Sequence, residues 1–356
     1  MFYKFKNKKV IITGHTGFKG SWLTLWLKLL GAKIIGISLD VPTKPSHYDK
    51  LNLGKKIINI KLDIRNLKKL EKIFKKYQPD YVFHLAAQSL VKKSYTDPIE
   101  TFTTNTIGTM NVLESLKKIN KKFAAVIITS DKSYKNLEIK RGYHEKDLLG
   151  GKDPYSASKG AAEIIIQSFV NSYFKKNKSK NIAVARAGNV IGGGDWSENR
   201  LIPDCIKSWS VNKKAMIRNP KSTRPWQHVL EAIRGYLTLA ICLYKDHKLH
   251  GEPFNFGPKH SQNKNVITLV KEMKKHWNSI SWEEKKSKND LYESKLLKLD
   301  STKARKKLKW KPIMNFDETI KMTTIWYKNF FEKKQINVFD LSKKQIEYYN
   351  KKIRIR

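Results

Sequence analysis

Cysteine, acidic residues and long apolar runs are all scarce in this sequence, and each shortage excludes a class of protein. Only Cys205 and Cys242 occur among 356 residues, far apart and without ligand spacing, so we expect neither a disulfide framework nor a metal site. The longest apolar stretch, Tyr236–Tyr244, is far shorter than the roughly 20 residues that a membrane-spanning helix needs. A lysine-rich opening leads directly into a strand-like run, which leaves no apolar region for a signal peptide. The sequence therefore predicts a cytoplasmic protein without a membrane segment.

The shortage of acidic residues gives the chain a formal net charge of +41, from 72 basic and 31 acidic residues. A charge of this size invites a nucleic-acid-binding interpretation. The lysines are nevertheless scattered along the chain, and many fall on the polar faces of amphipathic helices. We therefore predict a solvated basic surface and no nucleic-acid partner, with a minority of the basic residues serving an anionic substrate. A basic Rossmann-type protein that binds RNA and has lost catalysis is the alternative from another class.

Apolar β-branched runs alternate with helical patterns over residues 10 to 135, which predicts an α/β fold of the Rossmann type, a doubly wound parallel sheet. We expect strands at Val10–Thr13, Lys33–Ser38, Ile57–Lys61, Tyr81–Leu85, Ala125–Ser130 and Asn181–Ala187, and helices at Ser21–Leu30, Leu67–Tyr77, Thr104–Lys117 and about Tyr155–Tyr173. After residue 190 glycines and prolines interrupt short elements, which predicts a smaller C-terminal substrate-binding part. Ligands of such a sheet bind beyond the carboxyl ends of its strands.

A glycine-rich segment, Gly14-His15-Thr16-Gly17-Phe18-Lys19-Gly20, lies between the first expected strand and the first expected helix. Its glycines would allow a tight turn, a close approach of the backbone to a pyrophosphate, and close packing of the helix on the strand. The helix N-terminus would then direct unpaired N–H groups at the phosphates. We predict that Gly14, Thr16, Gly17, Phe18 and Gly20 bind a dinucleotide, and a plain tight turn is the alternative.

Tyr155 and Lys159 are spaced at i and i+4, which places them on the same face of a helix. A phenol has a reference pKa near 10, so a base that works near pH 7 needs its anion favoured by ~4 kcal/mol. An adjacent ammonium supplies the opposite charge that lowers the pKa. The pair is therefore a candidate for proton transfer, and a surface tyrosine beside a lysine is the alternative.

The G-x-x-G-x-x-G spacing resembles the extended branch of the short-chain dehydrogenase/reductase family, as does Asp153-Pro154 ahead of the Tyr–Lys pair. The likeness extends from residue 8 to about residue 330. It implies NAD as the cofactor, whose positive nicotinamide ring would also favour the phenolate. It further implies that Ser130 hydrogen-bonds the reacting hydroxyl. Chains of this family pair through the helices that here contain Thr104 and Tyr155, so a homodimer or homotetramer is implied.

The same resemblance implies a series of cofactor contacts at the ends of successive strands. Asp40 would accept from the adenosine ribose, although Ser38 is nearer the usual acidic position, and Asp63 with Ile64 would meet the adenine. Loop chemistry such as helix capping is the alternative for these residues. The further implied cofactor residues are Leu85, Ala86, Ala87, Gln88, Asn105, Tyr155 and Lys159.

Asp131 and Lys132 follow Ser130, at a place where epimerases of the family usually have small uncharged residues. The dTDP- and GDP-sugar dehydratases have an acid pair there, because eliminating water across C5 and C6 of a hexose needs both an acid and a base. An Asp–Lys pair resembles the branch of the family that acts on CDP-glucose. The expected roles are Asp131 as the acid at the C6 hydroxyl and Lys132 as the base at C5. A turn cap is the alternative for Asp131, and a nucleotide-sugar 4-epimerase is the alternative activity.

Two later segments strengthen the likeness to the CDP-glucose branch: residues 186–204, with the run Gly192-Gly193-Gly194-Asp195-Trp196, and Arg224-Pro225-Trp226-Gln227-His228. The resemblance implies NAD-dependent dehydration of a nucleotide sugar, CDP-glucose, in deoxysugar biosynthesis. It implies substrate contacts for Ser94, Asn189, Arg200, Leu201, Arg224 and His228, although a packed, hydrogen-bonded ring is the favoured interpretation of His228. We predict an NAD-binding domain over residues 1–190, with about 225–257 returning to it, and a nucleotide-sugar-binding domain over 191–224 and 258–356.

Overall fold

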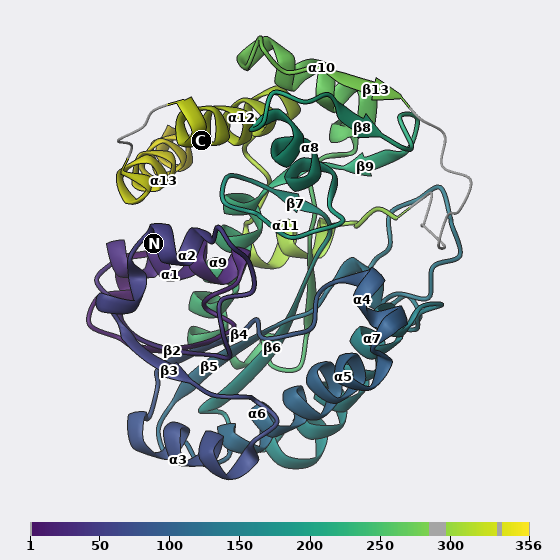
Figure 1. Cartoon of the computed structure of the whole chain (residues 1–356). Helices are drawn as coiled ribbons and strands as arrows, with labels where there is room; N and C mark the ends of the chain where they lie inside the picture. Colours follow the sequence, from purple (N-terminus) through teal and green to yellow (C-terminus); the bar gives the residue numbers. More distant parts are fainter. Residues whose placement is uncertain (1, 285–296, 333–336, 356) are drawn as a thin grey trace.

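A parallel sheet lies at the centre of the computed structural model, which describes residues 2–284, 297–332 and 337–355 (Figure 1). Within those residues the sheet has seven strands in the order β11-β6-β5-β4-β1-β2-β3. The strands are β1 (Lys9–Thr13), β2 (Lys33–Ser38), β3 (Ile58–Lys61), β4 (Tyr81–His84), β5 (Phe123–Ile128), β6 (Lys180–Ala187) and β11 (Pro253–Phe256). The expected Rossmann-type architecture is therefore confirmed.

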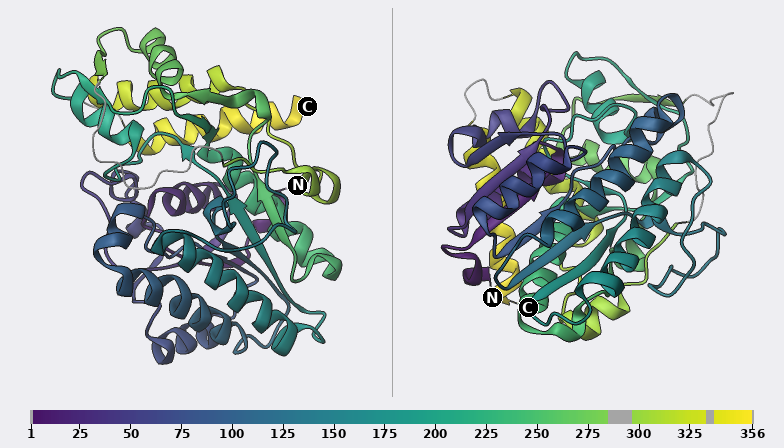
Figure 2. Two further views of the ribbon diagram at one scale, coloured as in Figure 1. Left: turned by 90° about the vertical axis from the view of Figure 1, so that its right-hand side faces the viewer. Right: turned by 90° about the horizontal axis from the view of Figure 1, so that it is seen from below.

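Both faces of the sheet are covered by helices because its strands are apolar on both sides. Along β1, Val10 and Ile12 belong to one apolar core and Ile11 to the other. The first core contains α1 (Phe18–Leu29) and α9 (Val229–Lys245), and the second contains α3 (Leu67–Tyr77), α6 (Gly108–Leu116) and α7 (Pro154–Phe169). Figure 2 shows this three-layer arrangement from two further directions. No helix within the described ranges is long and apolar enough to cross a membrane.

Two expected helices contain π-helical turns. The helix predicted at Thr104–Lys117 begins as the π-helical segment Thr103–Ile107 and continues as α6, and α7 is followed by a second π-helical segment, Val170–Phe174. Short elements connect them to the rest of the domain: α2 (His47–Lys50), α4 (Val91–Thr96) and α5 (Pro98–Phe102).

A smaller layer built from later residues lies over the carboxyl edge of the sheet (Figure 1). Its helices are α8 (Leu201–Trp209), α10 (Val266–His276) and α12 (Phe316–Glu332), whereas α11 (Thr302–Leu308) packs against β11 and α9 of the sheet part. Its two-stranded pairs are β7 (Val190–Ile191) with β10 (Gln227–His228), β8 (Ala215–Ile217) with β13 (Trp282–Glu284), and β9 (Thr223–Pro225) with β12 (Asn263–Asn265). The central sheet with its covering helices is called the first layer below. Because α9 and β11 pack in it, the chain returns to the first layer at the place where the predicted domain division has it return. The division itself stays a prediction.

The C-terminal helix α13 (Val338–Ile355) packs against α1 and α2. Its Tyr349 hydroxyl donates to Glu231 Oε2 of α9 at 2.6 Å and accepts from Arg234 Nε at 2.9 Å. The Tyr349 ring lies edge-on to Trp26 of α1, with 5.7 Å between ring centroids. The last helix is thus fastened to two helices of the first layer.

Candidate active site

The residues that the sequence singles out gather at the carboxyl edge of the sheet. The glycine-rich turn follows β1, Leu85–Ala87 follow β4, Ser130 and Asp131 follow β5, and Asn189 follows β6. β1, β4, β5 and β6 are neighbours in the sheet, so these four segments meet along one edge. This is the edge at which parallel α/β sheets bind ligands.

The glycine-rich turn depends on two glycines for its shape. Gly14 has φ +76°, and a Cβ there would lie 2.6 Å from the amide nitrogen of Ala86. A Cβ on Gly20 would lie 2.0 Å from the Gly14 carbonyl oxygen, so helix α1 can pack this closely only with glycine. Gly17 caps α1 without a side-chain hydrogen bond, so its first-turn N–H groups have no side-chain acceptor. The turn therefore fits a dinucleotide phosphate by its backbone alone.

The residues implied for the adenosine end of the cofactor lie at the ends of β2 and β3. Asp40 is exposed and forms an ion pair of 2.5 Å with Lys61, and its backbone carbonyl accepts from Thr16 Oγ1 at 3.2 Å, which places it beside the glycine-rich turn. Ser38 is buried, and its hydroxyl pairs with His15 Nδ1 at 2.9 Å. Asp63 is held by Arg65, with Oδ2 2.9 Å from Nε, and Ile64 is buried.

Three implied ligand residues direct their side chains into the protein instead. Asn105 is 1% exposed: its amide donates to Gln88 O at 3.0 Å and to Ser158 Oγ at 2.9 Å, and its oxygen accepts from Gln88 N. Gln88 bonds its own loop and Thr101. Ser94 is buried and donates to Val91 O at 2.6 Å. Asn105 thus joins the loop after β4 to α7, whereas Ser94 bonds only within α4; the predicted direct contacts of all three residues stay predictions.

Four side chains of the predicted catalytic set are buried side by side: Ser130, Asp131, Tyr155 and Lys159. Asp153 caps α7 by accepting from Ser156 N at 2.9 Å, and Pro154 begins the helix, so Tyr155 is in its first turn. Ser130 Oγ donates to Asp131 Oδ1 at 2.9 Å, and a hydrogen bond links Ser130 to the Tyr155 phenol. Lys132 is half-buried next to them, and its backbone N donates to Ser130 Oγ at 3.2 Å.

Burial changes the pKa values of these groups. It raises the pKa of Tyr155 to about 12, although the interaction with Ser130 opposes this change. It also raises the pKa of Asp131, which favours the protonated acid, and it lowers the pKa of Lys159 to about 8. Without the cofactor the net pKa of Tyr155 is therefore raised, because desolvation of the phenolate costs more than the neighbouring groups return. The expected lowering by the lysine together with the nicotinamide ring stays a prediction.

The turn Ser130–Lys132 contains the predicted acid and base and is called the acid–base turn below. A buried ion pair behind this turn was missed from the sequence. Glu163 of α7 and Arg186 of β6 are each 1% exposed at the side chain, with Arg186 Nε 2.8 Å from Glu163 Oε1. Glu163 Oε1 also accepts from Thr129 Oγ1 at 2.7 Å and from Ser133 Oγ at 2.9 Å, on either side of the Ser130–Lys132 turn. A lone acid in the apolar run Ala161–Ile166, four residues after Lys159, was the available signal.

The predicted substrate residues divide into two groups. Asn189 is exposed, and Arg200 pairs with Asp195 Oδ2 at 3.1 Å where α8 begins; the half-buried Leu201 follows it. Arg200 is close enough to Tyr155 for its charge to oppose the rise in the pKa of that phenol.

The second group lies on β9 and β10. Arg224 on β9 donates to Thr223 O at 2.8 Å. His228 is completely buried, caps α9 through Nδ1 and lies edge-on to Trp22. The ring is packed as the structural interpretation expects, but its Nε2 has no hydrogen-bond partner within the described residues, and a substrate contact stays a prediction.

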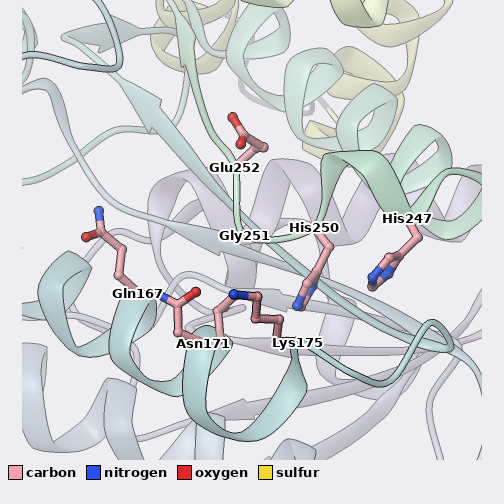
Figure 3. A pocket seen from close by; sticks show the side chains of 8 residues that line it. Gln167, Asn171, Lys175, His247, His250, Gly251 and Glu252 are labelled. Atoms are coloured by element: carbon pink, nitrogen blue, oxygen red, sulfur yellow. The ribbon is translucent and has the colours of Figure 1, made fainter.

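A polar cavity of about 290 Å³ lies elsewhere, between the end of α7 and the segment that precedes β11 (Figure 3). Its lining residues are Gln167, Val170, Asn171, Lys175, His247, His250, Gly251 and Glu252. These residues lie toward the amino end of β11 and include none of the predicted site residues. The predicted catalytic residues at the carboxyl edge are therefore separate from it.

A seven-stranded Rossmann sheet with a glycine-rich turn after β1 and a buried Ser–Tyr–Lys set defines an extended short-chain dehydrogenase/reductase. Residues 11–323 match the family described as GDP-mannose 4,6 dehydratase. The chain is 43% identical to a CDP-glucose 4,6-dehydratase of Salmonella typhimurium over 349 residues, which cover 97% of this chain and 96% of that one. The chain therefore belongs to the GDP-mannose 4,6 dehydratase family.

Two solved structures share the fold. An epimerase of Methanothermobacter thermautotrophicus superposes with a TM-score of 0.79 at 25% identity, covering 93% of this chain and 95% of that one. A dTDP-glucose 4,6-dehydratase of Bacillus anthracis, solved in complex with NAD, superposes with a TM-score of 0.74 at 22% identity, covering 91% and 98%.

Proposed function

We propose that this enzyme converts CDP-glucose to CDP-4-keto-6-deoxyglucose, with NAD held tightly and regenerated in each cycle. The observation that carries the proposal is the buried acid Asp131 beside Ser130 and Tyr155, with Lys132 next in the chain. An acid and a base at this place are what an elimination needs and an epimerisation does not. The 43% identity to a CDP-glucose 4,6-dehydratase over nearly the whole chain supports the choice of sugar nucleotide.

The glycine-rich turn would hold the cofactor diphosphate, Asp40 the adenosine ribose, and Asp63 with Ile64 the adenine. NAD, when bound there, supplies the hydride acceptor for C4 and the hydride donor for C6, and its positive ring opposes the burial that raises the pKa of Tyr155. Lys159 lies one helical turn beyond Tyr155 and would position the bound cofactor. The backbone fit of Gly14 and Gly20 supports this placement.

The protein's side chains would move three protons. Tyr155 takes the proton of the C4 hydroxyl, which Ser130 orients. The resulting C4 ketone acidifies the C5 proton, which Lys132 removes, while Asp131 protonates the departing C6 hydroxyl. Burial raises the pKa of Asp131, which keeps the acid protonated more often at neutral pH than a solvated carboxyl.

The nucleotide sugar would be bound by Arg200, Leu201, Asn189 and Arg224 from the smaller layer. A guanidinium can bind a diphosphate through two parallel hydrogen bonds, which suits Arg224 and Arg200. The assembly would be a homodimer or homotetramer formed through the helices of Thr104 and Tyr155. An exposed apolar face on these helices and on α5 supports this: Ile99 is 74%, Ile107 42% and Ile164 59% exposed.

The test is turnover of CDP-glucose labelled with deuterium at C4, beside a panel of other nucleotide-glucoses. We expect the label at C6 of the product and solvent hydrogen at C5. Asp131→Asn should slow the elimination roughly 10²–10⁴-fold and let reduced cofactor accumulate, visible by its absorbance. Label returned to C4 in an epimeric product would overturn the proposal in favour of a 4-epimerase, and preference for another nucleotide would overturn the choice of CDP.

A further inference from the structure

Lys19 is a lysine within the glycine-rich turn, at the second residue of helix α1. The turn can hold phosphates through its backbone, so this position does not need a charged side chain for that purpose. The lysine is half-buried all the same. A partly buried ammonium needs a negative group or a hydrogen-bond acceptor to offset the loss of water.

Helix geometry shows which way the side chain is directed. Residues three apart lie on one helix face, and Trp22, three residues after Lys19, donates from Nε1 to Gly193 O at 2.9 Å. The Phe18 ring is also close to Gly192, 3.4 Å from where a Cβ on Gly192 would lie. Helical side chains tilt toward the N-terminus, which for α1 is the carboxyl edge of the sheet. Lys19 therefore points between the Gly192–Asp195 segment and the acid–base turn.

The charges around Lys19 agree with this direction. Arg200, Asp131 and Asp195 are the charged groups that act on it, and it acts in turn on Lys159. Burial, assisted by Arg200, lowers the pKa of Lys19 to about 8, so the side chain is still mostly a cation at pH 7.

The two neighbouring cations, Lys19 and Arg200, differ in their ion-pair partners. Arg200 has Asp195 at 3.1 Å. Across the described parts of the chain, the Lys19 ammonium has neither an ion pair within 4 Å nor a hydrogen bond. A partly desolvated ammonium without an acceptor is costly, and a second cation beside it raises the cost. Their joint arrangement suits a ligand with two adjacent negative groups.

We propose that Lys19 is a further ligand-binding residue of the active site and that its ammonium, with Arg200, binds a diphosphate. The inference rests on the proposed function for the identity of the ligand. Both the nucleotide sugar and the cofactor contain a diphosphate. The nucleotide sugar is favoured, because Lys19 faces the Gly192–Arg200 segment of the smaller layer, whereas the cofactor diphosphate is accounted for by the backbone of the turn.

The experiment compares Lys19→Met and Lys19→Arg with the wild-type protein, all as full chains purified with their cofactor. Lys28→Met is the matched control, since it removes an exposed lysine from the same helix. Calorimetry measures the affinities for CDP and for cytidine, and NAD released on denaturation measures cofactor occupancy. We expect Lys19→Met to weaken CDP binding about 10- to 100-fold and to leave cytidine binding and NAD content unchanged. Lys19→Arg should retain most of the affinity.

Loss of NAD with unchanged CDP affinity would assign the diphosphate to the cofactor. Unchanged affinity for both ligands would overturn the proposal. So would an equal loss of CDP and cytidine affinity, because that would mean a general disruption of the nucleotide site. If wild-type protein does not turn over CDP-glucose, the proposed function fails, and the same comparison with the nucleotide that is accepted still tests Lys19.

Discussion

The turn from Thr129 to Ser133 has two sides with opposite character. On the inner side, Glu163 and Arg186 are buried and every polar group has close partners: Glu163 accepts from Thr129, Ser133 and Arg186, and Arg186 also donates to the Tyr134 hydroxyl at 2.6 Å. On the ligand side, Asp131, Tyr155 and Lys159 are equally buried, but burial has moved the pKa of each away from its usual value.

The two sides of the turn therefore have different roles: the inner side stabilises the fold, and the ligand side is suited to proton transfer. A buried pair with all its hydrogen bonds satisfied fixes geometry, whereas buried groups with shifted pKa values are characteristic of sites that move protons. Glu163 is shared by both sides, because its charge also raises the pKa of Lys159. Substitutions on the two sides should therefore give different signatures.

Tyr155→Phe should have the largest effect, confined to the ligand side. Removing a general base costs roughly 10²–10⁴-fold in rate. The ring still fills its buried site, so thermal unfolding and bound NAD should stay near wild type. Steady-state turnover and a melting curve on the same preparation check both expectations. More than about a tenth of the wild-type rate would rule out Tyr155 as the base.

Glu163→Gln should instead unfold the protein more easily. The substitution leaves the Arg186 charge buried without its charged partner, which lowers the free energy of unfolding by about 3–5 kcal/mol. Urea unfolding measures the loss. Arg186→Met in the Glu163→Gln background is the control, because it removes the stranded charge and should recover part of the stability. A single variant as stable as the wild type would mean that the pair does not hold the turn.

Lys159→Met should reveal a smaller, pH-dependent effect. The pKa of Lys159 is lowered from 10.5 to about 8 in the folded protein. Between about pH 8 and 10.5 the unfolded chain keeps this proton and the folded chain has lost it, so the stability of the wild type rises with pH. Its advantage over the variant should grow by roughly 3 kcal/mol across this range.

Urea unfolding at several pH values measures that growth, with Lys28→Met as the control for removing a lysine from the surface. Parallel pH dependence in wild type and Lys159→Met would contradict the lowered pKa.

The first layer of the fold followed from local patterns. The strands β1 to β6 lie within two residues of their expected ends, because β-branched runs bounded by turns specify a buried parallel strand. The same order along the chain placed Ser130, Asp131, Tyr155 and Lys159 together, since all four follow β5, the first two directly and the other two near the start of α7.

Other features depend on contacts between distant residues and could not be read locally. The two- and three-residue strands of the smaller layer exist only because of the partners they pair with. Glu163 and Arg186 are separated by 23 positions in the sequence. The direction of the Lys19 side chain follows from the hydrogen bond between Trp22 and Gly193, which the sequence does not reveal. The pKa of Tyr155 rose because the site is deeply buried, and a spacing of i and i+4 contains no information about burial.

The position of β11 has a consequence for synthesis on the ribosome. β6 is complete at Ala187, but its outer neighbour β11 ends only at Phe256. During translation β6 therefore remains an open sheet edge until about 70 further residues have left the exit tunnel, and unpaired edges are sites of aggregation. Helix α13, which contacts Trp26 through Tyr349, emerges later still. A nascent chain of this protein thus exposes the β6 edge until β11 has emerged, and the apolar surface of α1 at Trp26 until the later helix α13 has emerged.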